Sequence, residues 1–272
     1  MKKFRFLLYL LVAGSLTFVA CTKDDEDDAG DDTPPVKKEM KVVKMINEDG
    51  SYSVVLYNDD NNIKQILYKD AAGDDLPYYD DFLYTGTNVT TYTNYNNGAP
   101  NIRFIITYTG DKPVSAIYQV NNAGTLEDTY TLDFVFTGDQ LTEYTYSMDL
   151  AGTATPVLKF EFSYSGDNVS KTLTYGYTAS GLAMQSTVMN EYDSKKFYMF
   201  GYGIDYVFGN DRFLSPNNNT KTTKTDGADA PVDAESYNFT YEYNDNDYPT
   251  KETKKTFDDQ STVITTFEYS EL

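Results

Sequence analysis

The sequence predicts an all-β protein: a long, twisted antiparallel β-meander of repeated hairpins, curled on itself, with one irregular insert. Its composition is the first indication, because 26 Tyr and 16 Phe among 272 residues favour half-buried strands. A second indication is a hairpin pattern that occurs twice between residues 130 and 175. The third is the alternation of aromatic and polar residues within those strands, which has the period of a sheet with one buried face.

The two matching hairpins share a strand, a Gly-Asp turn and a returning strand. Their strands are expected at 130–136, 141–146, 158–164 and 169–175, with turns at Gly138 and Gly166. Tyr130, Leu132, Phe134 and Phe136 lie on one face of the first strand, and polar residues fall mostly on the other. We expect the aromatic face to be buried and the polar face to meet water.

The same pattern extends in both directions along the chain. Before the two hairpins, strands are expected at 53–57, 63–68 and 81–84, with a loop at 70–77. Turn glycines recur at Gly86, Gly110, Gly138 and Gly166, each with an aromatic residue two places earlier. A degenerate copy follows at 237–251, and residues 263–269 form the last strand. Ten or more strands with hardly any helix must curl over to cover the aromatic face.

One region, residues 191–219, breaks the alternation. It is dense in aromatic residues, and a short helix is expected around 197–207. A long interruption of a regular meander is often functional. The alternative is a plug that packs across the open aromatic face, and we favour it because the region has too many apolar residues to remain in water.

The N-terminal segment has the features of an export signal. Lys2, Lys3 and Arg5 precede a short apolar run, so residues 1–20 are expected to be a signal peptide. The run ends at Cys21, which resembles the acylated cysteine of a bacterial lipobox and is the predicted lipid attachment site. Residues 21–38 are expected to be the lipidated cysteine and a disordered acidic tether, and 39–272 a single β-meander domain. The Lys-Asp-Asp-Glu run after Cys21 resembles an export signal of surface lipoproteins, so the expected location is the outer membrane, lipid-anchored and facing the cell exterior.

Several motifs together carry a family resemblance. They are the hairpin Phe160-x-Phe-x-Tyr-x-Gly-Asp-x-Val, the insert segments Tyr192-Asp-Ser-Lys-Lys196 and Ser215-Pro-Asn-Asn-Asn219, and the ending Phe239-x-Tyr-x-Tyr243 followed by Tyr248-Pro-Thr-Lys251. In these motifs the chain resembles a Bacteroidota family of secreted lipoproteins with a β-meander domain of unknown function. Its hairpins are also similar to the YD (Rhs-type) repeats of cell-surface proteins. The resemblance implies a fold and a location, and no catalytic residues.

The composition excludes several kinds of chemistry. The chain has no His and a single Cys, which excludes Ser-His-Asp catalysis, His-ligated zinc and any intramolecular disulfide. Net charge is −20, which disfavours a nucleic-acid partner. The Asp/Asn clusters suit hairpin turns better than calcium sites, since none has EF-hand spacing. We therefore predict no catalytic residue, no metal and no cofactor.

Binding is the function class that the sequence favours. Tyrosine offers both a stacking face and a hydroxyl, which suits a non-catalytic surface lipoprotein that binds a glycan or protein partner. Tyr198, Tyr202 and Tyr206 of the insert are the candidate exposed ligand-binding residues. Two alternatives are a structural or adhesion component without a small-molecule site and, with less support, a carboxylate-based glycan hydrolase using acids such as Asp133, Glu143 or Glu161.

Overall fold

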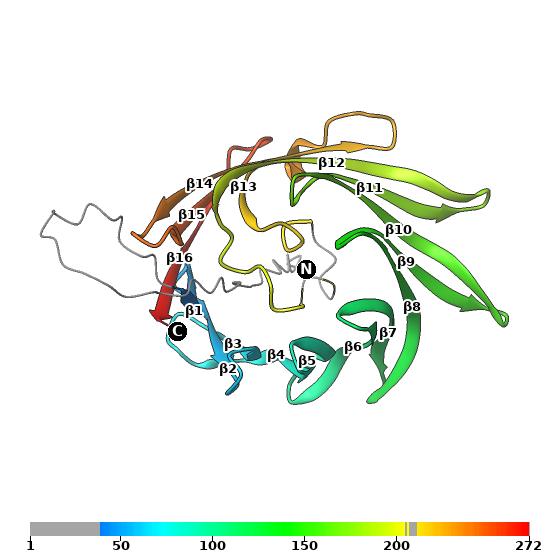
Figure 1. Cartoon of the computed structure of the whole chain (residues 1–272), viewed down its shortest axis with the longest axis horizontal. Coiled ribbons are helices and arrows are strands. Elements are labelled where there is room, and N and C mark those ends of the chain that lie inside the picture. The colour runs from blue at the N-terminus through cyan, green and yellow to red at the C-terminus, as the bar shows by residue number, and fades with distance from the viewer. Residues whose placement is uncertain (1–38, 205, 207–210, 272) are drawn as a thin grey trace, which may run out of the picture.

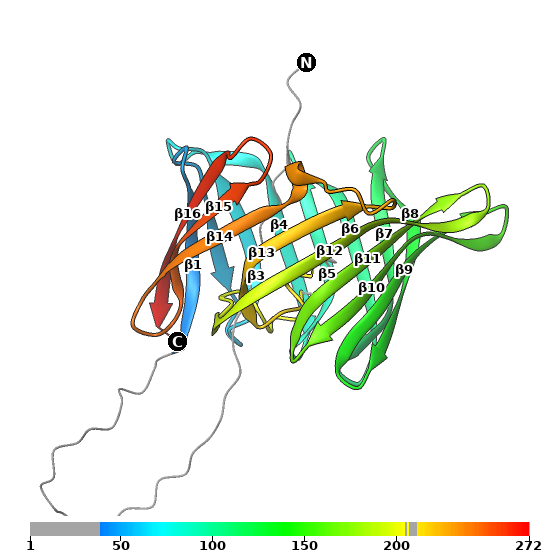
Figure 2. The ribbon, with the colours of Figure 1, turned by 90° about the horizontal axis from the view of Figure 1, so that it is seen from above.

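The chain folds into a closed antiparallel barrel of sixteen strands (Figures 1 and 2). This computed structural model describes residues 39–204, 206 and 211–271. Each strand pairs with its neighbours in the chain, and β1 closes the ring by pairing with β16. In chain order the strands are β1 Met40–Asn47, β2 Tyr52–Tyr57, β3 Ile63–Lys69, β4 Asp75–Thr85, β5 Asn88–Asn96, β6 Ala99–Thr109, β7 Lys112–Asn122, β8 Thr125–Thr137, β9 Gln140–Leu150, β10 Thr153–Ser165, β11 Asn168–Thr178, β12 Gly181–Lys196, β13 Asn217–Asp226, β14 Tyr237–Tyr243, β15 Pro249–Thr256 and β16 Thr262–Glu271.

Helix in the described part is limited to a 3-10 turn, η1 (Asp233–Glu235), and to Tyr206, which has a helical conformation. Within the described residues, no helix has the length and apolar character needed to cross a membrane.

Alternation along each strand separates an inner face from an outer face. In β8, Leu132 and Phe134 are buried, whereas the residues that follow each of them, Asp133 and Val135, are exposed. The buried side chains of the strands form one hydrophobic cluster with residues of the segment between β12 and β13, which lies inside the ring (Figure 1). The apolar face therefore points into the barrel and the polar face points out to solvent.

The segment between β12 and β13, residues 197–216, is the insert, and the barrel end where it lies is called the insert end. Phe197, Tyr198, Met199, Tyr202 and Ile204 are all buried in the cluster shared with the wall. Figure 2 shows this segment inside the ring, near the end where β1 begins. The described part of the insert thus has the plug arrangement.

The hairpin turns of the insert end are joined to one another. A residue at the start of a returning strand, or directly before it in the case of Asn62, donates a side-chain hydrogen bond to the turn-glycine carbonyl of the next hairpin. The donors Asn62, Asn88, Lys112 and Gln140 reach the carbonyls of Gly86, Gly110, Gly138 and Gly166, respectively. These glycines have φ near +60°, a left-handed conformation that glycine adopts without steric cost. The repeated turn sequence thus produces a row of hydrogen bonds between neighbouring hairpins at the insert end.

Four strand tyrosines donate their hydroxyls to the backbone of the preceding strand. Tyr164 donates its hydroxyl to the carbonyl of Leu141 on the preceding strand at 2.8 Å, where the ladder register shifts. Tyr57, Tyr192 and Tyr269 make the equivalent bonds to Val42, Val169 and Pro249, at 2.7–2.8 Å. A tyrosine can thereby bury its ring in the core and still satisfy its hydroxyl.

These observations confirm the expected all-β antiparallel architecture and its buried aromatic face. The closed ring is more specific than the curled meander that the sequence predicts. The loop expected at 70–77 is shorter, since β4 begins at Asp75, and the ends of the expected 191–219 insert belong to β12 and β13. Residues 197–204 form turns and bends, and part of the helix expected at 197–207 lies outside the described residues. The signal peptide, Cys21 and the tether also lie outside them.

Substitutions on opposite faces of β8 test the assignment of inside and outside. Leu132 is 0% exposed, so Leu132→Ala should lower the free energy of unfolding by about 2–5 kcal/mol. Val135, in the same strand and 48% exposed, supplies the matched control, and Val135→Ala should change it by less than about 0.5 kcal/mol. Urea denaturation of the purified chain measures both. A larger loss at Val135 than at Leu132 would contradict the assignment.

Candidate functional site

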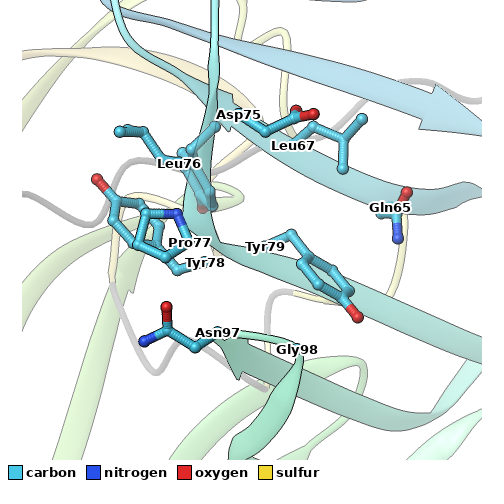
Figure 3. Close-up of a pocket in the computed structure, with 10 residues that line it drawn as sticks. Gln65, Leu67, Asp75, Leu76, Pro77, Tyr78, Tyr79, Asn97 and Gly98 are labelled. Atoms are coloured by element: carbon cyan, nitrogen blue, oxygen red, sulfur yellow. The ribbon is translucent and has the colours of Figure 1, made fainter.

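A pocket of about 360 Å³ lies between β3 and β4, at the barrel end opposite the insert (Figure 3). Its lining comes from β3, β4 and the turn between β5 and β6. The lining residues are Gln65, Leu67, Tyr68, Asp75, Leu76, Pro77, Tyr78, Tyr79, Asn97 and Gly98. Outward-facing side chains line the pocket together with Tyr68 and Tyr78 of the inner face, because the sheet is interrupted at this point.

The interruption is a bulge in β4. Leu67 pairs with Tyr79 and Lys69 pairs with Asp75, so two steps along β3 correspond to four along β4. Pro77 lies within the extra length, and its missing N–H suits a position outside the hydrogen-bonded ladder. Its carbonyl accepts a hydrogen bond from the backbone of Asn97, which ties the bulge to the next turn. The pocket is therefore a local consequence of two extra residues in one strand.

Two stacked tyrosines form the aromatic side of the site. Tyr79 in β4 and Tyr95 in β5 have ring centroids 4.6 Å apart and planes within 9° of parallel. They are cross-strand partners on the outer face of the barrel. Stacking on Tyr95 fixes the Tyr79 ring at the edge of the pocket. Burial and the nearby Asp81 raise the pKa of Tyr79, which keeps its hydroxyl protonated.

Polar side chains surround this ring. The Gln65 amide donates to Asp81 Oδ1 at 2.7 Å, and Lys69 forms an ion pair with Asp75 at 2.6 Å. No hydrogen-bond partner of the Tyr79 hydroxyl lies among the described residues. The site thus presents an amide, carboxylates and a phenol beside an aromatic face, which is suited to binding hydroxyl-bearing ligands.

The tyrosines predicted from the insert lie elsewhere. Tyr198 and Tyr202 are only 3% and 7% exposed, with rings 4.3 Å from Phe267 and 5.8 Å from Tyr57. The expectation that these two are exposed is therefore wrong, because their rings are needed to cover the inner face. A ligand-binding role for them stays a prediction that their burial does not favour.

Tyr206, the third predicted tyrosine, is half-buried and packs 5.8 Å from Phe136. It lines a hollow of about 380 Å³ at the insert end, which also has Asp139, Asp167 and Phe200 in its wall. This hollow and the β3–β4 pocket lie at opposite ends of the barrel, so the structure does not bring Tyr206 together with Tyr79.

The motifs quoted for the insert hold its base to the wall. Asp193 accepts hydrogen bonds from the backbone of Asn218, at 3.2 Å, and from the hydroxyl of Tyr243. Ser215 accepts from the backbone N–H of Val169 at 3.0 Å. These residues act in anchoring the insert.

Asp80 is the most enclosed acid of the wall. It is fully buried on the inner face and accepts hydrogen bonds from the hydroxyls of Tyr68 and Tyr92, at 2.6 and 2.8 Å, and from the amide of Asn94 at 2.9 Å. Burial raises its pKa above the ordinary value, although the three donors act in the opposite direction. All four side chains come from β3, β4 and β5, so this network braces the wall beside the pocket.

A buried ion pair connects the insert to β15, which lies two strands from β13 in the ring. Arg212 donates to Glu252 of β15, and both side chains are buried. The guanidinium lies between the rings of Phe197 and Phe239, 5.1 and 5.3 Å from their centroids. Its planar charge stacks on both rings while its edge meets the carboxylate.

The acids suggested for hydrolysis lie on the outer face. Lys159 forms ion pairs with Glu143 and Glu161, each at 2.8 Å. The hydrogen bond from Lys159 lowers the pKa of Glu161, which suits a salt bridge better than a proton donor. Among the described residues, no three acidic, Cys or His side chains gather closely enough to hold a metal ion.

Asn and Asp side chains at the turns bond to their own backbone. Asn58 accepts hydrogen bonds from the N–H groups of Asp60 and Asn62, and Asn244 accepts from Asn246 and Tyr248. This is the turn role that the sequence favours for them.

The sequence contains one sign of the pocket, and the regular hairpin pattern around it makes this sign easy to overlook. A proline within an otherwise strand-like stretch marks a bulge or an edge, and Pro77 follows this rule. The stacking of Tyr79 on Tyr95 has no comparable signal, because it depends on the register between β4 and β5.

Asp80 should make stability depend on pH. Its raised pKa in the folded state means that its contribution is complete below the unfolded pKa, about 3.8, and is lost as the pH rises through the folded pKa. The wild type should therefore lose stability relative to Asp80→Asn as the pH rises above about 4. Urea denaturation across this range measures the difference, with the exposed Asp133→Asn as the baseline for removing a charge. A difference that grows in favour of the wild type with rising pH would contradict the assignment.

Substitutions in the Arg212–Glu252 pair test how much this contact between the insert and β15 contributes to the free energy of unfolding. Arg212→Met leaves a buried carboxylate without its counter-charge and should cost about 3–5 kcal/mol of unfolding free energy. The double variant Arg212→Met/Glu252→Leu removes both charges and should recover most of that loss. Thermal and urea denaturation of the three proteins test this. Equal losses in the single and double variants would show that the pair is not coupled.

No protein-family model and no curated protein sequence matches this chain. Among the solved structures that are similar to this chain, two are described as porin-like proteins. One, from Bacteroides uniformis, is 13% identical with a TM-score of 0.52 and covers 86% of this chain and 98% of its own. The other, from Bacteroides vulgatus, is 10% identical with a TM-score of 0.54 and covers 86% of this chain and all of its own. At this identity the likeness concerns the fold alone.

Proposed function

We propose that this chain is a non-catalytic, lipid-anchored surface protein that works with its barrel in water and binds a glycan or protein partner. The single observation that supports it best is the chemistry of the two barrel faces. Charged side chains lie mostly on the outer face, and most aromatic side chains belong to the buried inner cluster.

Charges recur around the outer face. Ion pairs join Lys44 to Glu268, Glu191 to Lys221 and Glu242 to Lys251, each across neighbouring strands. The Glu143–Lys159–Glu161 group adds a further cluster on β9 and β10. A barrel that spans a membrane has the reverse pattern, an apolar outer band and a polar lumen.

Lipid contact with such a surface would be unfavourable. A single Lys or Arg facing lipid near the middle of a bilayer costs about 2–4 kcal/mol in a barrel. Several of the charged side chains here lie in the middle of their strands, including Lys159 and Lys221. We infer that the barrel stands outside the bilayer. The porin-like description of the two similar structures is accordingly not extended to this chain.

The expected anchor fits this placement. The chain enters β1 at Met40, at the insert end of the barrel (Figure 2). A lipid on Cys21 would hold that end towards the membrane, and the opposite end, with the β3–β4 pocket, would face away. A pocket directed away from the membrane is accessible to an external ligand.

A structural or adhesion role is the second candidate, and one observation favours it. Several large apolar side chains on the outer face of β4–β8 are exposed, among them Leu83 at 64%. Val114 and Val135 lie on the same side of the barrel. Apolar groups at the surface suit contact with another protein.

Removal of the lipid anchor tests whether the barrel lies in water or in the bilayer. In this variant residues 1–21 are replaced by a signal peptide that is cleaved without adding lipid. The protein should then be found in the soluble fraction with the melting temperature of the lipidated form. Fractionation with a carbonate wash measures its distribution, and the unaltered chain is the membrane-bound control. Retention of the folded, lipid-free protein in washed membranes would overturn the proposal.

A further inference from the structure

We propose that the β3–β4 pocket is a saccharide site that selects neutral sugar units and stacks them on Tyr79. The inference rests on the proposed function and deepens it, by naming the ligand class and the place where it binds.

The Tyr79 ring has the properties of a sugar platform. One of its faces is occupied by Tyr95, 4.6 Å away and nearly parallel, so the ring cannot rotate freely. The ring forms part of the pocket wall, beside Gln65 (Figure 3). The C–H face of a pyranose is apolar and packs on an aromatic face, while its hydroxyls remain at the edge. An ordered ring costs little conformational entropy on binding.

Hydrogen-bonding groups lie where the hydroxyls of a stacked sugar would be. A 2.7 Å hydrogen bond holds Gln65 and Asp81 together, and this amide and carboxylate lie next to Tyr79 on the outer face. Asn97 and Pro77 stand on the other side of the pocket (Figure 3). Amide and carboxylate groups bond to pairs of hydroxyls, and they discriminate strongly against ligands that lack them.

The charge around the pocket selects against acidic sugars. Asp75 lines the pocket and Asp81 is bonded to its Gln65. Lys69, the cation beside Asp75, already pairs with that carboxylate at 2.6 Å. The chain as a whole carries a net charge of −20. A sulfated or uronic-acid ligand would approach against this field, so the site favours uncharged saccharides.

The size of the pocket distinguishes a sugar from a protein partner. Its volume of about 360 Å³ is in the range of small-ligand pockets, from roughly 300 to 1,000 Å³. A stable protein interface instead covers about 800 Å² on each partner, mostly without deep hollows. The pocket therefore fits one or two sugar units at the end or side of a longer glycan.

The test uses the full chain, purified in detergent, on an array of neutral and acidic glycans. Binding to neutral glycans is expected, and isothermal titration then gives the affinity for the best oligosaccharide. Tyr79→Ala should weaken that affinity by at least about tenfold, through loss of the stacking face. Tyr79→Phe should retain most of the affinity, because the ring remains. Tyr177→Ala, which removes an exposed tyrosine on β11, should stay within about twofold.

Each outcome decides a different point. If a folded Tyr79→Ala variant bound glycans as the wild type does, the β3–β4 pocket would not be the binding site, although the protein would still bind glycans. Binding to acidic glycans alone would overturn the selectivity. Binding to no glycan would overturn the saccharide proposal, and a protein partner would then carry the proposed function. Melting temperatures of the three variants show whether a loss of affinity reflects unfolding. A further variant, Gln65→Ala, leaves the tyrosine pair in place and should also lower the affinity.

Discussion

The strict alternation of aromatic and polar side chains is the constraint on which the rest of this structure depends. Each hairpin makes one apolar face that must be hidden from water, and no single hairpin can hide its own. Pairing β1 with β16 turns sixteen such faces towards a common interior and leaves no sheet edge exposed. A ring this wide cannot be filled by wall side chains alone. The insert supplies the missing apolar volume, which explains why its aromatic residues are buried.

Closure also explains where polar groups are tolerated inside. Asp80 and Arg212 are each surrounded by several hydrogen-bonding or stacking partners, as buried polar groups require. Arg212 ties the insert to β15, whereas Asp80 ties three strands of the wall together. The interior is thus apolar overall, with polar contacts where the insert meets the wall and beside the bulge in β4. A water-filled lumen would have the opposite balance.

Sequence reasoning recovers the parts of this fold that depend on local pattern. The hairpin period, the turn glycines and the inward face of β8 follow from residues close together in the chain, and the structure has them. Ring closure depends on a contact between Met40–Asn47 and Thr262–Glu271, and no local pattern encodes the number of strands at which a meander closes. The insert tyrosines show the same difference. Their density in the sequence indicates either a core or a binding surface, and only the position of the surrounding wall decides between the two. The β3–β4 pocket depends on a two-residue excess in β4, for which Pro77 is the one local sign.

The pairing of β1 with β16 has a consequence for the order in which the barrel folds. The ring cannot close until β16, the last of its sixteen strands in chain order, has been synthesised. Until then, the aromatic faces of the other strands lack the strand that closes the ring, and this exposes them to aggregation. A chain cut short before β16 would present two open sheet edges, and chaperones and proteases would act on it. Closure by one strand thereby makes that strand a condition for the survival of the folded protein.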